Sequence, residues 1–414
     1  MQVANISFDK TFPMPAILER PAINTADELL QKINQLAPAL QENRNNEESA
    51  RRLSKETIQL LRKNKLHQLY LPETLGGLEL DPISTAKLVE AVSMHNTAAG
   101  WSMMVANVAT WWCWRLNEKG VETIFGNGNE TMIAGAFHPP MAATRDKGGL
   151  RINGRSPLCS NVHDSNYTFV TAMVMENGQP IFHDGIPEIY GVMMKTSEVN
   201  IIDTWDTIGM RATDSCDVEA KNIFVPEELS FPLAPVWEAN HYFDGPTYRF
   251  PALGASIASL IAPVALAVAR NAIDEVKTIA TKKTSFGSVS NLAGRGAVQS
   301  KIGKAEALLR AGRIYLYGEL EIAWNKTLSG ELLSLEEKAS LSLAATHCNQ
   351  SCFQAVDLMY SVAGTTGIYM RSALSHLFMD AQVIRQHGFA NESRYETAAQ
   401  VFLGLPPDLP VLGF

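Results

Sequence analysis

A histidine followed by a glycine is the pair in this sequence with the clearest capacity for chemistry. His387 and Gly388 stand near the end of the stretch Asp380–Phe389. An imidazole, with an ordinary pKa of about 6.5, can donate or accept a proton near neutral pH, whereas glycine has no group that does either. The structural alternative is a helix C-terminal histidine before a glycine cap, which only complements the helix dipole. The pair alone leaves both interpretations open.

Other polar residues carry weaker signals. His95 stands at the head of Asn96–Gly100, where a lone histidine is more often a capping or surface residue. Cys348 and Cys352, next to His347, share one helical face and could ligate a metal. The sequence has no second ligand pair at zinc-like spacing, and buried cysteine commonly serves as a small apolar filler, so we predict no metal site.

Composition indicates a globular protein with a substantial core. The chain has 414 residues, of which 46% are hydrophobic and 19% are charged. These values exclude a disordered or fibrous chain. A formal net charge of −8 argues against nucleic acid as a partner, because a phosphate backbone requires a basic face.

The sequence predicts a cytoplasmic protein. Met1–Lys10 lacks the basic flank and apolar run of a secretion signal, and the 5 cysteines are an odd number that forms no disulfide framework. The apolar run Ala252–Ala269 approaches the length of a membrane span. It contains glycine, serine and proline and has no aromatic belt, so we predict a helix buried in a bundle and no membrane partner.

Apolar periodicity predicts a helical, then strand-rich, then helical chain. Spacings of three and four residues predict helices over 26–41, 47–65, 83–114, 253–281, 297–327, 334–363 and 374–386. Short apolar runs predict strands at 167–174, 189–194 and 219–226. Ser334 and Glu337 have capping-box spacing, which predicts a helix start there.

This order predicts an α+β fold. We expect an N-terminal helical domain over residues 1–135, a central β-barrel-like domain over 136–250 and a C-terminal four-helix bundle over 251–414.

Five motifs follow one another along the chain. They are Leu71–Leu78 with a proline and a double glycine, Ala98–Trp101, Gly154–Ser160, Thr204–Val218 continuing to Glu228, and Gly364–Gly367 followed by Asp380–Ala381. In this order they resemble the acyl-CoA dehydrogenase superfamily, and especially its flavin-dependent monooxygenase branch. The resemblance covers roughly residues 25–405, and the tryptophan-containing segment Thr204–Val218 is its most specific part.

Two departures from the dehydrogenase pattern favour the monooxygenase branch. Dehydrogenases of this family typically carry Thr-Glu-Pro at the start of the barrel, where this chain has Phe137–Met141. One type of dehydrogenase keeps its carboxylate base at the position of Gly388, although other members keep it on a different helix. The chain lacks this proton acceptor at Gly388.

The resemblance implies the oxygenase component of a two-component flavin monooxygenase. Such an enzyme uses reduced FMN or FAD supplied by a separate flavin reductase, together with O2, and shields the oxygenated flavin from water. The implied substrate is a small aromatic compound such as a phenol or an indole. The implied assembly is a homotetramer whose flavin sites are shared between subunits.

By the same resemblance, three residues are candidate catalytic groups. Ser160 would hold the ring-nitrogen proton of the flavin through a hydrogen bond, although a serine there could be a plain turn former. His387 would either remove a proton from the substrate or stabilise charge that develops on the peroxide. His95 is the weaker candidate.

Further residues are candidates for holding the flavin. They are Ser160, Trp205, Arg211, Thr213 and Ser215 near the ring or ribityl chain, and Lys283, Phe286, Gly364 and Gly367 near a phosphate across a subunit interface. Lys283 stands where relatives have arginine, which keeps the charge but loses bidentate geometry. Arg211 could equally form a surface ion pair, and Gly364–Gly367 could be a plain turn.

The sequence leaves alternatives open for the role of its tryptophans and for the function of the chain. The tryptophans at 101, 111, 112 and 114 could line a pocket for a flat substrate, but large aromatic residues are more often core. An acyl-CoA dehydrogenase with a relocated base, or a catalytically silent flavin-binding protein, would carry the same motifs.

Overall fold

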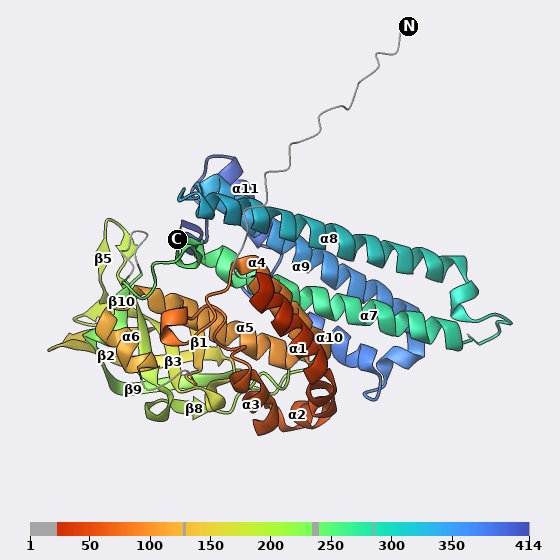
Figure 1. Cartoon of the computed structure of the whole chain (residues 1–414), viewed down its shortest axis with the longest axis horizontal. Helices are drawn as coiled ribbons and strands as arrows, with labels where there is room; N and C mark the ends of the chain where they lie inside the picture. Colours follow the sequence, from red (N-terminus) through yellow and green to blue (C-terminus); the bar gives the residue numbers. More distant parts are fainter. Residues whose placement is uncertain (1–22, 127–129, 234–239, 285, 414) are drawn as a thin grey trace, which may run out of the picture.

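The computed structural model describes residues 23–126, 130–233, 240–284 and 286–413. Met1–Lys10, on which the cytoplasmic prediction partly rests, lies outside the described residues. Figure 1 shows a helical N-terminal part, a strand-rich part and a bundle of long helices. The structure is therefore a mixed arrangement of helices and sheet, as predicted.

Most of the helices lie close to the predicted ranges. The helices are α1 (Ile23–Glu42), α2 (Arg44–Ala50), α3 (Lys55–Lys63), α4 (Pro82–His95), α5 (Thr97–Trp112), α6 (Glu118–Phe125), α7 (Ala262–Lys282), α8 (Gly296–Leu328), α9 (Leu335–Ala363), α10 (Ala373–Ile384) and α11 (Arg394–Phe402). Of these, α6 and α11 were not predicted. The capping box at the start of α9 is confirmed, because Ser334 and Glu337 exchange both hydrogen bonds.

Two predicted helices are each divided by a local backbone feature. The predicted helix 47–65 ends at Arg51, which adopts a left-handed conformation, and α3 starts afresh from the N-cap Ser54. The helical character predicted over 83–114 is confirmed, but it is divided between α4 and α5. Asn96 is extended, and its side chain accepts the Ala99 N–H to begin α5. Asparagine and serine compete with the helix backbone in this way and therefore favour helix starts.

The strands form one eight-stranded sheet and a separate two-stranded hairpin. They are β1 (Ile133–Asp146), β2 (Gly149–Cys159), β3 (Tyr167–Glu176), β4 (Gln179–Pro180), β5 (Phe182–His183), β6 (Ile186–Pro187), β7 (Ile189–Lys195), β8 (Asn200–Ile202), β9 (Cys216–Pro226) and β10 (Ser230–Pro232). The order is β10-β7-β3-β1-β2-β9-β8, with β4 beside β3. β1 and β3 are parallel, and the other pairs are antiparallel.

The predicted barrel is not confirmed. The described strands follow an open path from β10 to β8, so the sheet does not close within the described residues. The first strand begins at Ile133 and the last ends at Pro232. The domain boundaries placed at 136 and 251 stay predictions.

The long C-terminal helices pack side by side. α8 and α7 both pack on α9, and α10 packs on α7 and α9 (Figure 1). A buried π-helical segment, Gly254–Ile261, leads into α7. By length and composition, Gly254–Lys282 is the one helix among the described residues that could cross a membrane, but 83% of its apolar window is buried inside the protein. Such burial is typical of a core helix.

The core is thickest where α5 crosses the sheet. Nearly every residue of α5 is buried, and Trp112 stacks with Phe169 on β3 and Phe231 on β10. Trp111 contacts Trp112 and Trp114 edge-on. Because buried aromatic side chains each contribute roughly 3–5 kcal/mol relative to alanine, this cluster fixes the distance between α5 and the sheet.

The motif segment Thr204–Val218 is fastened to α10. Asp380 Oδ1 accepts the backbone N–H of Met210 at 2.6 Å. Gly209 lies so close to α10 that an added Cβ would overlap the backbone of Met379. The segment and α10 therefore meet at a fixed separation that only glycine at 209 permits.

We expect Gly209→Ala to destabilise the protein by about 1–3 kcal/mol, the usual cost of overpacking a close contact. Gly388→Ala is the matched control, because a Cβ there meets open space. Thermal or urea unfolding measures both variants. Equal stability of Gly209→Ala and Gly388→Ala would contradict the close contact with α10.

Candidate functional site

Two cavities are lined by several of the predicted site residues. The inner cavity, of about 710 Å³, is lined by Ser160, Trp205, Thr213, Ser215 and His387 together with apolar side chains. The polar cleft, of about 850 Å³, is lined by His95 and Arg211 among other polar residues. Both volumes lie within the roughly 300–1,000 Å³ usual for ligand sites. The structure thus brings together five of the predicted residues and separates two from them.

Residues from every part of the chain line the inner cavity. α5 contributes Trp101, β1 contributes Phe137 and β2 ends beside Ser160. The motif segment contributes Trp205, and the chain after α10 contributes His387. The cavity therefore exists only because the helices, the sheet and the bundle meet there.

Trp101 links the two main candidate residues. Its indole Nε1 donates a hydrogen bond to Ser160 Oγ at 3.1 Å. Its ring meets the ring of His387 edge-on, with 5.5 Å between centroids. Trp101 therefore belongs to the cavity wall, whereas Trp111 and Trp112 belong to the core.

Three hydroxyl groups form a short chain on one wall of the inner cavity. Ser160 Oγ lies 2.7 Å from Ser215 Oγ, which lies 2.7 Å from Thr213 Oγ1. Thr213 Oγ1 in turn donates to the carbonyl oxygen of Met210 at 2.8 Å. The same carbonyl accepts the indole N–H of Trp205 at 3.0 Å.

Strained backbone surrounds these hydroxyls. Leu158, Asn161, Met210 and Asp214 have positive φ angles of 64°, 58°, 51° and 50°. Such conformations cost about 1–3 kcal/mol each for residues other than glycine and cluster at functional sites. The hydrogen bond from Asn161 N–H to the Thr213 carbonyl, at 2.7 Å, joins the two strained stretches.

His387 is held as a neutral imidazole with a defined tautomer. Burial lowers its pKa to about 4. The backbone N–H of Phe389 donates to Nδ1 at 3.2 Å, so Nδ1 carries no proton in the neutral ring. The proton is then on Nε2, the nitrogen left for the cavity. His387 therefore presents a hydrogen-bond donor, and the alternative role of proton acceptor is disfavoured.

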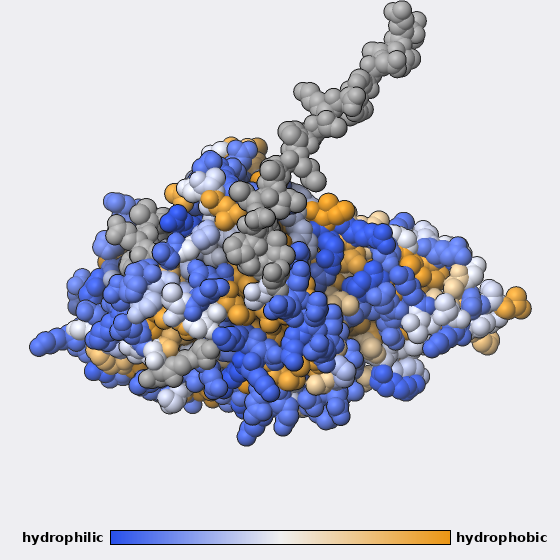
Figure 2. All heavy atoms as spheres, viewed as in Figure 1, coloured by the Kyte–Doolittle hydropathy of each residue, from blue (hydrophilic) through white to orange (hydrophobic). Residues whose placement is uncertain are grey.

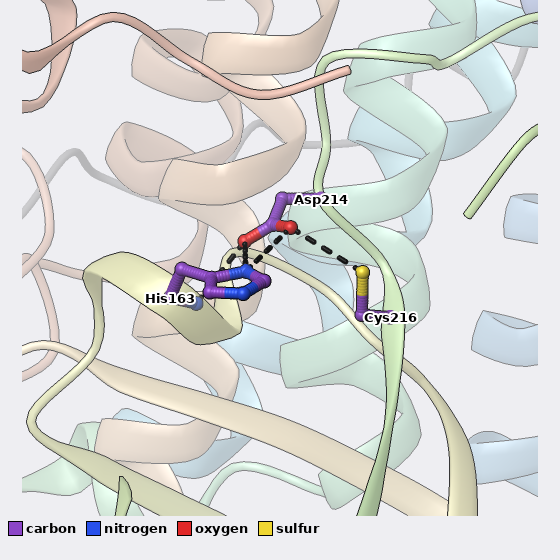
Figure 3. Close-up of side chains that lie close together, drawn as sticks. All are labelled: His163, Asp214 and Cys216. Carbon is purple, nitrogen blue, oxygen red and sulfur yellow. Dashed lines mark hydrogen bonds and ion pairs between the residues drawn. The ribbon is translucent and has the colours of Figure 1, made fainter. Parts of the chain in front are cut away.

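His163, Asp214 and Cys216 form a cluster next to Ser215. Figure 3 shows Asp214 facing both His163 and Cys216. The Asp214 carboxylate accepts from His163 Nδ1 at 2.9 Å and from the Cys216 thiol at 3.5 Å. Burial, with the nearby Asp214 charge, raises the pKa of Cys216 to about 11, so the group is a neutral thiol. These hydrogen bonds of Asp214 hold the chain on either side of Ser215 in place.

The polar cleft is lined by two predicted site residues, His95 and Arg211. His95 Nδ1 accepts from Gln41 at 3.3 Å, and burial lowers the pKa of His95. Arg211 forms an ion pair with Asp206 at 3.0 Å and donates to two backbone carbonyls, of Thr207 and Glu48. Arg211 thus folds its own segment, and its flavin-binding role stays a prediction.

One ion pair in the polar cleft was not anticipated from the sequence. His376 Nδ1 lies 2.5 Å from Glu48 Oε2, and its Nε2 donates to the Met370 carbonyl at 2.6 Å. The Glu48 carboxylate raises the pKa of His376. No sequence pattern connects α2 with α10, so only the fold reveals this pair.

The predicted phosphate-binding residues lie at the opposite end of α7. Lys283 Nζ donates to the Ala363 carbonyl at 2.6 Å and to Thr366 Oγ1 at 2.8 Å, which joins Lys283 to the turn containing Gly364 and Gly367. Ile261, directly before α7, lines the inner cavity. The 21 residues of α7 span about 30 Å at 1.5 Å per residue, so these residues are remote from the cavity of their own chain.

The comparison with known proteins agrees with this geometry. Residues 259–392 match the family described as acyl-CoA dehydrogenase, C-terminal domain. The chain is 29% identical to an indole-3-acetate monooxygenase from Pseudomonas putida over 86% of this chain and 89% of that protein. It is 21% identical to the flavin-dependent monooxygenase oxygenase subunit HsaA from Rhodococcus jostii, over 88% and 95% of the two chains.

A solved structure has the same fold. XiaF from a Streptomyces species, in complex with FADH2 and glycerol, superposes with a TM-score of 0.86 over 94% of this chain and 98% of that chain, at 19% identity. The chain is therefore similar to the acyl-CoA dehydrogenase family over residues 259–392 and to monooxygenases over most of its length.

The lining of the inner cavity suits a flat aromatic ring such as that of a flavin. Its aromatic walls match a flat ring, and Ser160, Thr213 and Ser215 place polar atoms at one side. Asp206 is the one carboxylate among the described lining residues, and Arg211 pairs with it. The described lining contains no lysine or arginine. The described lining therefore contains no carboxylate that is free of an ion pair.

We expect His387 to titrate well below the ordinary histidine pKa of about 6.5, because burial disfavours its cation. The ring should thus stay neutral across the physiological range. The linked prediction is a loss of stability as pH falls from about 6.5 towards 4, where the unfolded chain takes up the proton first. NMR titration, with His387→Gln to assign the resonance, measures the pKa. A pKa at or above 6.5 would contradict this environment.

Proposed function

We propose that the chain is the oxygenase component of a two-component flavin-dependent monooxygenase. It would take reduced FMN or FAD from a separate flavin reductase and use O2 to hydroxylate a small aromatic compound of the phenol or indole type. The observation that carries the proposal is the inner cavity, which combines a neutral imidazole and a serine hydroxyl while its one described carboxylate is paired with Arg211.

The lining supports an uncharged aromatic ring as the reacting part of the substrate. Trp101, Phe137, Trp205 and Phe389 offer flat apolar surfaces. A carboxylate on the reacting ring would find no cationic partner among the described lining residues, and an unpaired buried charge is costly. The similarity to an enzyme named for indole-3-acetate supports an aromatic ring as the reacting group.

His387 and Ser160 would have different roles in the reaction. A bound reduced flavin would supply the electrons and the site of oxygen activation. His387 would donate its Nε2–H to negative charge that develops on oxygen, and a donor so placed in a dry site contributes strongly. Ser160 would hold the N–H at the ring edge, and the apolar wall excludes water.

The proposed assembly is a homotetramer with flavin sites shared between subunits. Lys283, remote from the inner cavity of its own chain, would reach the phosphate of a neighbour's flavin. Exposed apolar residues gather near it: Phe286, Val289, Ile368, Tyr369 and Met370. Figure 2 shows orange atoms at this end of the bundle. We also propose a cytoplasmic location, which agrees with the 5 cysteines being free.

We expect the purified protein, mixed anaerobically with reduced FMN or FAD and then with oxygen, to produce a long-lived absorbance distinct from that of oxidised flavin. The largely apolar cavity should delay the decay to oxidised flavin and hydrogen peroxide that free reduced flavin shows. Stopped-flow absorbance measures this, with free flavin as control. Tightly bound oxidised FAD that an acyl-CoA bleaches would instead establish a dehydrogenase, and neither behaviour would indicate a silent flavin-binding protein.

We expect His387→Ala to slow hydroxylation by roughly 100-fold, the scale for loss of one preorganised donor. His387→Gln retains a donor but no base, so it should keep most of the rate. Equal losses in both variants would support a base instead. Ser160→Ala should mainly increase peroxide release per turnover, because the ring N–H loses its partner. Rapid-quench product analysis and peroxide assays separate the two effects.

A further inference from the structure

The hydroxyl chain beside the inner cavity has one possible arrangement of its protons. It contains three oxygen–oxygen contacts, which are Ser160 to Ser215, Ser215 to Thr213 and Thr213 to the Met210 carbonyl, at 2.7, 2.7 and 2.8 Å. At such distances each contact must contain a proton. Three hydroxyls supply three protons, one per contact.

The carbonyl end fixes the direction of the whole chain. The Met210 carbonyl has no proton to give, so Thr213 donates to it. Thr213 has then used its single proton and must accept from Ser215. Ser215 has likewise used its proton and must accept from Ser160. The proton of Ser160 therefore points along the chain and away from the cavity.

Ser160 is consequently left as a hydrogen-bond acceptor. One of its two lone pairs receives the indole N–H of Trp101 at 3.1 Å. The other has no partner among the described residues, and Ser160 lines the inner cavity. A ligand that meets this oxygen must bring a proton of its own.

The two redox states of a flavin differ in this respect. Reduced flavin carries a proton on N5, the nitrogen at the edge of its central ring, whereas oxidised flavin presents a lone pair there. We propose that the Ser160–Ser215–Thr213 chain makes the site selective for reduced over oxidised flavin, with Thr213 as the residue that fixes the polarity. The proposal rests on the proposed function, because it requires a flavin in the inner cavity.

The surroundings maintain this polarity. Thr213, Ser215 and Ser160 are all buried, so water does not compete for their protons. The Asp214 cluster holds the backbone beside Ser215, and the Trp205 indole shares the Met210 carbonyl. Thr213 lines the cavity, but it gives its proton to the Met210 carbonyl, so it orients the protons of Ser215 and Ser160. It is a positioning residue.

Thr213→Val tests the proposal, because valine keeps the shape and removes the hydroxyl. Ser215 would then have no acceptor at 213 and could donate to Ser160, which frees the Ser160 proton for the cavity. We expect the ratio of the Kd for oxidised flavin to the Kd for reduced flavin to fall by about 3- to 10-fold, the effect of an ordinary hydrogen bond. Ser215→Ala should lower the ratio in the same direction.

Thr213→Ser is the matched control, because it retains both the proton and the acceptor and should keep the wild-type ratio. Fluorescence titration gives the Kd of oxidised FMN or FAD, and anaerobic titration gives that of the dithionite-reduced form. The midpoint potential of the bound flavin, measured by spectroelectrochemistry, should shift to more negative values in Thr213→Val and Ser215→Ala. Should Thr213→Val fail to fold, Ser215→Ala provides the comparison.

The outcomes separate this inference from the proposed function. A wild-type ratio in both Thr213→Val and Ser215→Ala, with reduced flavin still bound, would overturn the inference and leave the proposed function standing. Failure of the wild-type protein to bind either redox state of FMN or FAD would overturn both.

Discussion

The geometry of the site depends on the hydrogen bonds that the backbone N–H and carbonyl of Met210 make. The N–H is bound to Asp380 on α10, and the carbonyl accepts from Trp205 and Thr213. The segment around Met210 is also tied to the N-terminal helices, because Arg51 donates to the Trp205 carbonyl at 3.0 Å. One short stretch thus connects the bundle, the sheet and the N-terminal helices. The left-handed conformation of Met210 is the local cost of making these contacts at once.

The described lining of the inner cavity carries almost no unpaired charge. Burial keeps His387 neutral, Asp206 is paired with Arg211, and the described lining has no further charged side chain. Asp380, close behind the wall, has its pKa raised to about 6 by burial, opposed by the Met210 N–H. Oxygen chemistry on a flavin is favoured by an apolar and neutral surrounding, since water promotes release of peroxide. Proton abstraction from a thioester would need a free carboxylate instead.

Much of the architecture could be predicted from the sequence. Helix and strand ranges follow from apolar periodicity, and the capping box at Ser334 marks the start of α9. The helical stretch predicted over 83–114 is divided into α4 and α5 because one asparagine, Asn96, competes locally with the helix backbone. The barrel is not confirmed because strand order and closure depend on pairings between distant residues, such as β10 with β7, which periodicity does not encode.

The sequence by itself determined which chemical groups are available: an imidazole at His387, a hydroxyl at Ser160 and no carboxylate at Gly388. Only the tertiary structure decided how they are used. Trp101 and Ser160 are 59 residues apart, and Ser160 and Ser215 are 55 apart, yet each pair is hydrogen-bonded. The tautomer of His387 and the proton direction of Ser160 depend on which neighbours accept and which donate. These roles are properties of contacts between distant residues, so they arise only when the chain is folded.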